Sequence, residues 1–227
     1  MPRETLDRHI HQIQDEILLL GSMVEQANLG AIDALKRRDA RTAERILQDD
    51  TKINEKRFAI ENAIVICLAT QQPMAHDLRN LAAFLEVSTE LERMGDYAKG
   101  IAKVVVRLGD SDIPVPIREL EQMAEIAIGM LHRALGAFIS ENASVASQIP
   151  KDDDLVDELY NRIYHIMLNC MIANPEIIDH ASLLLWVDHN LERLADRVTN
   201  ICERTVFVAT GELLEFELED NEEEYDV

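Results

Sequence analysis

The sequence predicts an all-α protein of two pseudo-symmetric three-helix bundles, with six long helices and a disordered acidic C-terminal tail. Three observations support this fold class. Hydrophobic residues make up 47% of the 227 residues but aromatic residues only 4%, and the abundant Ala, Leu, Glu, Arg and Ile favour helix over sheet. Helix-breaking residues are few. The stretch LERMGDYAKGIA at 91–102 returns as LERLADRVTNIC at 191–202.

Turn-forming residues divide the chain into six long segments. They lie at Asp39, Gln72-Pro73, 109–116, Asn142 and Asn174-Pro175. Pro73 and Pro175 each follow a polar residue and precede a periodic apolar run, as a proline in the first turn of a helix does. We therefore expect these two prolines to open the third and sixth helices.

The first, third and sixth segments each carry an apolar stripe with spacings of three and four residues. Such a stripe is typical of a helix that buries one narrow face. The three stripes are Leu6, Ile10, Ile13, Ile17, Leu20 and Val24; Phe84, Val87, Leu91, Met94, Ala98, Ile101 and Val105; and Val187, Leu191, Leu194, Val198, Ile201 and Val208. The third and sixth helices are therefore expected to be equivalent.

The second segments also match, because DDTKIN at 49–54 resembles DDDLVD at 152–157. The spacing between the halves is about 100 residues, too long for a solenoid unit of about 20–50 residues. It predicts a duplicated three-helix unit, with a first bundle over 1–110, a second over 111–215 and the acidic tail over 216–227. A segment with acidic but no basic residues repels itself and is expected to be disordered.

The net charge of −21 excludes several classes of partner. A surface this acidic repels nucleic-acid phosphates and anionic lipid headgroups, so we expect neither nucleic-acid binding nor membrane insertion. No apolar run is long enough to cross a bilayer, and no signal region opens the chain. Three cysteines without a Cys-x-x-Cys pair fit a reducing compartment. We expect a cytoplasmic protein.

The repeated motif places paired carboxylates on one helix face. Glu92 and Asp96 are four residues apart, as are Glu192 and Asp196. Like charges at this spacing cost about 0.2–0.5 kcal/mol, which a bound cation would offset. Helical periodicity turns these carboxylates away from the apolar stripe, so a solvated face is the alternative. Both halves nevertheless keep Leu, Glu, Arg and Asp while the residues between them differ.

The second helix of each half supplies further oxygen ligands at equivalent places. These are Asp49, Asp50 and Asn54 in the first half and Asp152, Asp153 and Asp157 in the second. Sets of oxygen ligands suit Mg²⁺, Ca²⁺, Mn²⁺ or iron, whereas zinc and copper prefer His or Cys. No His follows a Glu by three residues, so the di-iron motif of ferritin-like bundles is missing. The sequence also lacks a Gly-rich phosphate loop and a Gly-x-Ser-x-Gly elbow, so no enzyme is indicated.

Several stretches together resemble the PhoU family of phosphate-transport regulators. They are DDTKINEKR, ATQQPMAHDLRNLAAFLEVSTELERMGDYAKGIA and NLERLADRVTNICE, and the similarity covers most of residues 5–210. The resemblance implies two pseudo-symmetric three-helix bundles with surface clusters of iron, zinc or other metals. It also implies a homodimer that is not an enzyme. Such a protein would contact the phosphate ABC transporter ATPase and a phosphate sensor histidine kinase, and would repress the phosphate regulon.

Carried over to this sequence, the family's metal motif falls on Glu92 and Asp96 and on Glu192 and Asp196. The neighbouring helices would contribute Asp50, Asp153 and Asp157. Asn54 stands where the second half has Asp157, so the two donor sets are unequal. Two other functions stay open: a metal-dependent enzyme acting on phosphate esters with two cations about 4 Å apart, and a helical scaffold that binds no metal.

Overall fold

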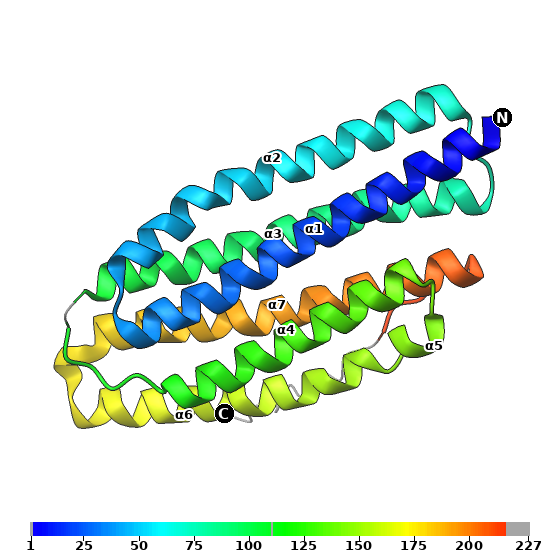
Figure 1. The fold of residues 1–227 in the computed structure, drawn as a ribbon. Coiled ribbons are helices and arrows are strands. Elements are labelled where there is room, and N and C mark those ends of the chain that lie inside the picture. The colour runs from blue at the N-terminus through cyan, green and yellow to red at the C-terminus, as the bar shows by residue number, and fades with distance from the viewer. Residues whose placement is uncertain (1, 110, 217–227) are drawn as a thin grey trace.

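The computed structural model describes residues 2–109 and 111–216, and all regular elements in these ranges are helical. The first bundle consists of α1 (Pro2–Arg37), α2 (Ala40–Gln71) and α3 (His76–Leu108). The second consists of α4 (Ile117–Ile139), α6 (Asp153–Ala173) and α7 (Ile178–Thr210), with the short elements α5 (Ala143–Ala146), η1 (Ile149–Asp152) and η2 (Pro175–Ile177). Figure 1 shows the two bundles side by side. The predicted all-α fold of six long helices is confirmed.

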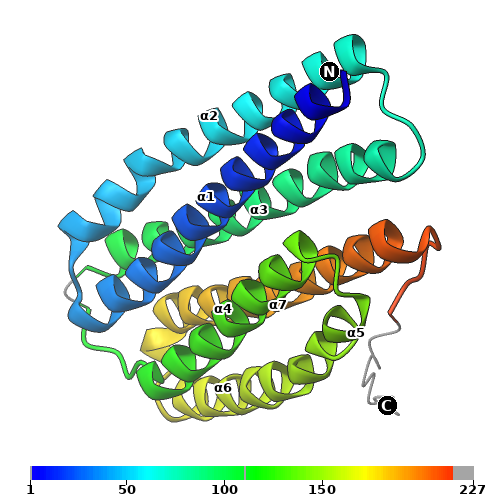
Figure 2. The same ribbon diagram turned by 45° about the vertical axis from the view of Figure 1, so that its right-hand side comes forward.

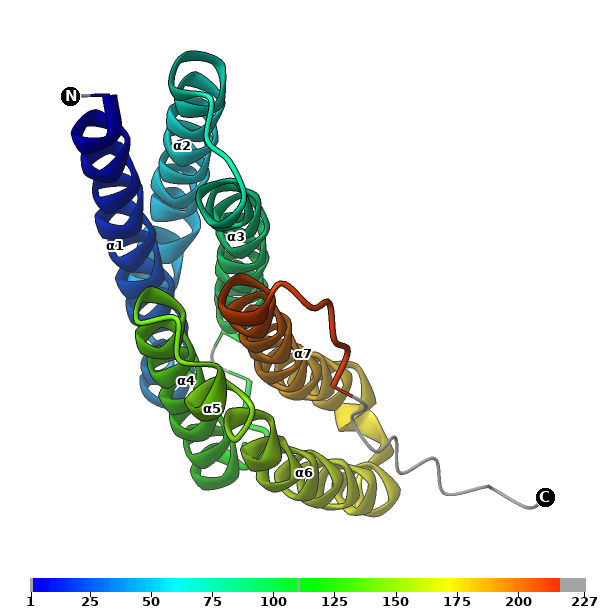
Figure 3. The same ribbon diagram turned by 90° about the vertical axis from the view of Figure 1, so that its right-hand side faces the viewer.

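The third helices of the two bundles form the junction between them. In the end-on view of Figure 3, α3 and α7 lie side by side, α1 and α4 cover one side of the pair, and α2 and α6 lie at opposite ends. The two helices run antiparallel, because Glu86 pairs with Arg204 and Glu90 with Arg197. Both copies of the repeated motif therefore lie near the middle of the molecule. Figure 2 shows the same arrangement from a second direction.

The three apolar stripes are buried as predicted. Every member of each stripe belongs to the hydrophobic core. Thr205, the polar residue within the last stripe, is also buried and donates its hydroxyl proton to the carbonyl of Ile201, 2.9 Å away. A threonine that bonds to its own preceding turn is tolerated in a helical core, because its polar atom is satisfied.

Polar residues at the predicted breaks cap the helices that follow them. Asp39 accepts hydrogen bonds from the backbone N–H groups of Arg41 and Thr42 at the start of α2. Asn142 does the same for Val145 at the start of α5. Each cap satisfies N–H groups that have no partner within the helix. The breaks at these two positions are therefore confirmed.

Pro73 does not open the third helix, and this prediction was wrong. It lies in the connection between α2 and α3, and α3 begins at His76. Gln72 ends α2 in the left-handed conformation with φ 49°, and Ala75 has φ 50°. A helix cannot pass through a residue with positive φ, so α3 starts only after Ala75. Pro175 opens the single turn η2, immediately before α7.

The fifth predicted segment is interrupted, unlike its counterpart α2. After Asn142 the chain forms α5 and η1 before α6 begins at Asp153. Pro150 explains the break, because proline lacks the N–H that the interior of a helix requires. As a result Asp153 stands in the first turn of α6, whereas Asp50 lies inside the long helix α2.

In the part of the chain that the structure describes, none of the helices combines the length and apolar character needed to cross a membrane. The acidic residues 217–227 of the predicted tail lie outside the described residues. The division into 1–110 and 111–215 remains a prediction.

Candidate metal centres

The first candidate site lies between α2 and α3. Its predicted carboxylates are Asp50 on α2 and Glu92 and Asp96 on α3, and a lysine that the sequence analysis did not consider joins them. Lys99 Nζ lies 2.6 Å from Asp50 Oδ2 and 3.5 Å from Asp96 Oδ1. Asp50 is buried, and Asn54 donates a hydrogen bond of 3.3 Å to the same Oδ2 atom. The first cluster thus contains its own cation.

Acidic and basic side chains around the first cluster shift the pKa of Glu92 in opposite directions. Burial raises the pKa of Glu92, with smaller contributions from Asp96 and Asp50, while Arg57 and Arg93 act to lower it. The hydrogen bond to Asp50 raises the pKa of Lys99, so its amine remains a charged ammonium. The side chain of Asp96 is 51% exposed, in agreement with the helical periodicity, and the arginines and Lys99 balance much of the negative charge.

The second candidate site lies between α6 and α7 and is more deeply buried. Burial, together with the nearby carboxylates of Asp196, Asp157 and Glu192, raises the pKa of Asp153 to about 7. Burial, followed by the charges of Asp196 and Asp157, raises the pKa of Glu192 to about 7 against the opposing effect of Arg193. All four predicted residues of the second half are therefore close enough to repel one another.

Asp188 is a fifth carboxylate that sequence reasoning missed. Its side chain is fully buried, and neither carboxyl oxygen has a hydrogen-bond partner among the described residues. Burial and, to a lesser extent, the charge of Glu192 together raise the pKa of Asp188 to about 8. The spacing was visible in the sequence, because 188, 192 and 196 form a series with steps of four along one helix face.

Other polar atoms around the second cluster also lack partners. Glu192 Oε2 and the Thr199 hydroxyl are buried without a hydrogen bond among the described residues. His189 Nδ1 lies 3.4 Å from Glu192 Oε2, but burial and Arg193 lower the pKa of this histidine and favour its neutral form. Thr199 lines a surface cavity together with Glu192 and Asp196. Unpaired buried oxygens of this kind are costly unless a ligand satisfies them.

The side chains do not form a finished coordination shell. Among the described residues, no three His, Cys, Asp or Glu side chains are arranged to hold one ion. Carboxylates on neighbouring helices would have to rotate toward a common point to bind a metal. The structure therefore brings the predicted donors into two clusters but does not preform a metal site.

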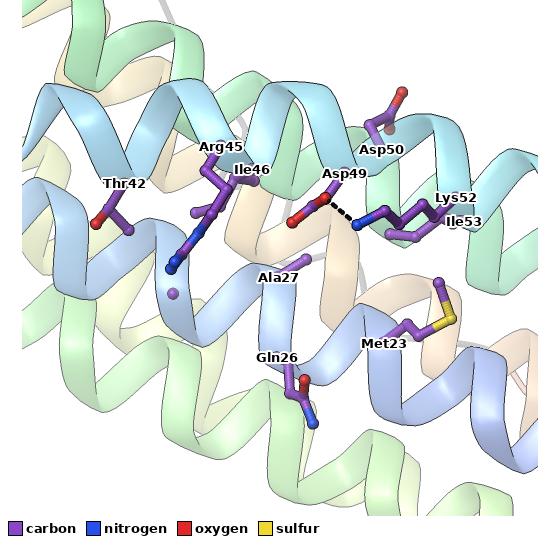
Figure 4. A pocket seen from close by; sticks show the side chains of 12 residues that line it. Met23, Gln26, Ala27, Thr42, Arg45, Ile46, Asp49, Asp50, Lys52 and Ile53 are labelled. Atoms are coloured by element: carbon purple, nitrogen blue, oxygen red, sulfur yellow. Dashed lines mark ion pairs between the residues drawn. The ribbon is translucent and has the colours of Figure 1, made fainter.

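Two neighbouring aspartates of the predicted ligand series are engaged elsewhere. Asp49 pairs with Lys52 at 2.6 Å on the wall of a groove between α1 and α2. Figure 4 shows the Asp50 carboxylate pointing away from this pair. In the second half, Asp152 pairs with Arg133 of α4. Neither Asp49 nor Asp152 belongs to its carboxylate cluster.

Comparison with protein families gives a match in each half of the chain. The model of the PhoU domain matches residues 17–105 and again residues 120–205. A phosphate-specific transport system accessory protein PhoU homolog from Clostridium acetobutylicum is 34% identical over 212 residues, covering 93% of this chain and 97% of that protein. A homolog of the same description from Caulobacter vibrioides is 35% identical over 200 residues, covering 88% of this chain and 87% of that protein.

Two solved structures have the same fold along nearly their whole length. The phosphate transport system regulatory protein PhoU from Streptococcus pneumoniae superimposes with a TM-score of 0.86 at 33% identity, covering 93% of this chain and 100% of that one. PhoU from Pseudomonas aeruginosa superimposes with a TM-score of 0.85 at 26% identity, covering 91% and 99% of the two chains.

Proposed function

Since the chain belongs to the PhoU family, as a homolog of accessory regulatory proteins of phosphate-specific transport, we propose that it restrains phosphate uptake by direct protein contact. Its partners would be the ATPase of the phosphate ABC transporter and a phosphate sensor histidine kinase, both reached in the cytoplasm. The observation that carries this proposal is the match of both halves to one regulatory domain, with nearly full coverage of the relatives.

The protein is not an enzyme. The family to which it belongs consists of regulatory accessory proteins, so the alternative of a phosphate-ester hydrolase is set aside. We propose instead that the regulator works stoichiometrically: one copy, or a homodimer, binds the transporter and the kinase when phosphate is plentiful. The phosphate regulon is then repressed because the kinase is held in its inactive state.

We also propose that carboxylates of this chain bind a metal ion. The residues concerned are Glu92, Asp96 and Asp50 in the first half and Glu192, Asp196, Asp153 and Asp157 in the second. A bound cation would neutralise the clustered carboxylates and offer an open coordination position to an anionic group of a partner. The second half favours such an ion through its charge, because both oxygens of the buried Asp188 lack a hydrogen-bond partner among the described residues.

The chemistry of the donor set narrows the choice of metal. The carboxylates supply only oxygen, which suits Mg²⁺, Mn²⁺, Ca²⁺ or iron. His189 places one imidazole nitrogen, Nδ1, 3.4 Å from Glu192 Oε2. Among the metals implied by the family resemblance, this set favours iron over zinc.

The regulatory proposal can be tested with the purified chain and its cognate partners. Size-exclusion chromatography with light scattering should show a stoichiometric complex with the transporter ATPase, and a second with the cytoplasmic part of the kinase. In cells lacking their own regulator, this chain should restore repression of a phosphate-regulon reporter in high phosphate. A folded chain that binds neither partner would refute the proposal.

A further inference from the structure

The two carboxylate clusters differ at four positions that affect their charge. This inference rests on the metal-binding part of the proposed function. The offsets of 100 and 103 residues pair Lys99 with Thr199 and Arg57 with Tyr160. They also pair Ser88 with Asp188 and Asn54 with Asp157. All four differences remove positive charge from the second cluster or add negative charge to it.

In the first half, an ammonium group occupies the place between the two helices. Lys99 Nζ contacts Asp50 of α2 at 2.6 Å and lies 3.5 Å from Asp96 of α3. An ion that bridges the helices would have to use the same carboxylate oxygens. Binding there would displace Lys99 from a partner that is itself buried, and breaking a buried ion pair is costly.

In the second half, no side chain from the corresponding position enters the cluster as a cation. Thr199 replaces the lysine, and its buried hydroxyl has no hydrogen-bond partner among the described residues. One turn before Glu192, Asp188 is fully buried with both oxygens unpaired, whereas Ser88 in the first half donates its proton to the Leu85 carbonyl. A cation would compensate the desolvation of the ionised Asp188 carboxylate, which has no hydrogen-bond partner among the described residues.

Arg57 is the one neighbouring arginine that differs between the halves, because it lowers the pKa of Glu92 and Tyr160 stands in its place in the second half. Arg193 acts on Glu192 as Arg93 acts on Glu92, because the two arginines are equivalent residues of the repeated motif. The contrast therefore lies in the same four pairs of residues: Lys99 and Thr199, Ser88 and Asp188, Arg57 and Tyr160, and Asn54 and Asp157.

We propose that the duplicated motif has diverged into one metal site and one internally neutralised site. The second half binds the cation through Asp153, Asp157, Glu192 and Asp196, and Asp188 supports the site as a buried carboxylate beside Glu192. In the first half, the Lys99 ammonium replaces the ion and keeps Asp50 and Asp96 together without a metal.

The repeat provides a matched control for the experiment. The full-length protein is stripped with chelator and dialysed against Fe²⁺ under anaerobic conditions, and separately against Mn²⁺, Mg²⁺ and Zn²⁺. Bound metal is then quantified by inductively coupled plasma mass spectrometry. The E192Q/D196N pair removes charge from the second half, and the E92Q/D96N pair makes the same change in the first. Circular dichroism and thermal melts establish that each variant is folded.

We expect E92Q/D96N to retain the metal of the wild type and E192Q/D196N to lose it. D188N should weaken binding by about 10- to 100-fold, as losing one supporting carboxylate does in other metal sites. K99T copies the residue of the second half and should create additional metal binding that E92Q/D96N then abolishes. The reciprocal variant T199K should reduce metal binding. If T199K does not fold, E192Q/D196N still tests whether the second half binds the metal.

Each other outcome is informative. Equal loss of metal in both motif pairs would overturn the asymmetry but leave the proposed metal binding intact. A wild type that binds none of the four metals would overturn the metal proposal and this inference together. The regulatory proposal would still stand, because partner binding is measured separately.

Discussion

Three carboxyl groups of the second cluster, those of Asp153, Asp188 and Glu192, have pKa values raised by burial and by neighbouring carboxylates. Asp188 and Glu192 illustrate what a single sequence could and could not reveal. The motif predicted Glu192 from its spacing, but burial of Asp188 depends on how α6 and α4 cover α7. A helical wheel drawn for one helix does not show how the neighbouring helices pack against it. Lys99 was missed for the same reason, since its contact with Asp50 joins two helices.

The D188N substitution should stabilise the metal-free protein in a pH-dependent way. Burial, followed by Glu192, raises the pKa of Asp188 from 3.8 to about 8. A raised carboxyl pKa favours folding below pH 4, and that contribution is lost progressively as pH rises toward 8. Asparagine cannot ionise, so D188N should match the wild type near pH 4 and melt at a higher temperature at pH 8.

Thermal melts in chelator between pH 4 and 9 would measure this difference. If the difference in melting temperature between the wild type and D188N stayed constant with pH, the raised pKa of Asp188 would be contradicted. S88N in the first half is the control, because it introduces the same amide where no carboxylate is lost.

At the scale of elements, the close approach of α2 and α3 depends on a small residue. A Cβ atom added to Gly95 would lie 3.1 Å from two atoms of Ile53, tighter than ordinary van der Waals contact. The second half has Ala195 at the equivalent position, where Val156 replaces the isoleucine. Compared with the second half and its helices α7 and α6, the first half therefore pairs a smaller residue on α3 with a larger one on α2.

We expect G95A alone to lower the free energy of unfolding by about 1 kcal/mol, because overpacking outweighs the better helix propensity of alanine. Adding I53V should remove the clash, so the double variant should recover most of the loss. Urea unfolding of the wild type, G95A, I53V and the double variant forms a double-mutant cycle. We expect it to give a favourable coupling free energy between the two substitutions of about 1 kcal/mol. Strict additivity of the two changes would show that the contact imposes no constraint.

Secondary structure was predicted better than the connections were. The three apolar stripes specified the long helices correctly because a stripe with a period of 3.6 residues depends only on local sequence. Pro73 failed because the left-handed Gln72 and the positive φ of Ala75 are set by the closure between α2 and α3. Pro150 was not counted as a breaker, although it divides the predicted fifth helix.

At the scale of the whole molecule, the two bundles are joined by a polar contact on the α3–α7 pair. Glu90 accepts hydrogen bonds from Arg197 Nη1 and Asn200 Nδ2, both at 3.2 Å, and also pairs with Arg93 at 3.1 Å. Its side chain is only 13% exposed. The nearby pair of Glu86 and Arg204 at 3.0 Å is more open, with Glu86 54% exposed.

We expect E90A to destabilise the protein by about 3 kcal/mol, because it leaves two partly buried donors of α7 without their acceptor. E86A, the matched control on the same helix, should cost no more than about 1 kcal/mol, as exposed pairs do. Calorimetry should also show a broader transition for E90A if the junction couples the two bundles. Equal effects of the two variants would show that burial at the junction is unimportant.

The antiparallel crossing of α3 and α7 relates the halves as two subunits of a symmetric dimer would be related. In such a dimer of identical three-helix chains, any mutation would change both copies at once. A lysine that closed one metal site would close the other as well. When the two halves are joined in one polypeptide, a mutation changes only one of them. A gene fusion would therefore have allowed one half to keep its metal ligands while the other half lost metal binding.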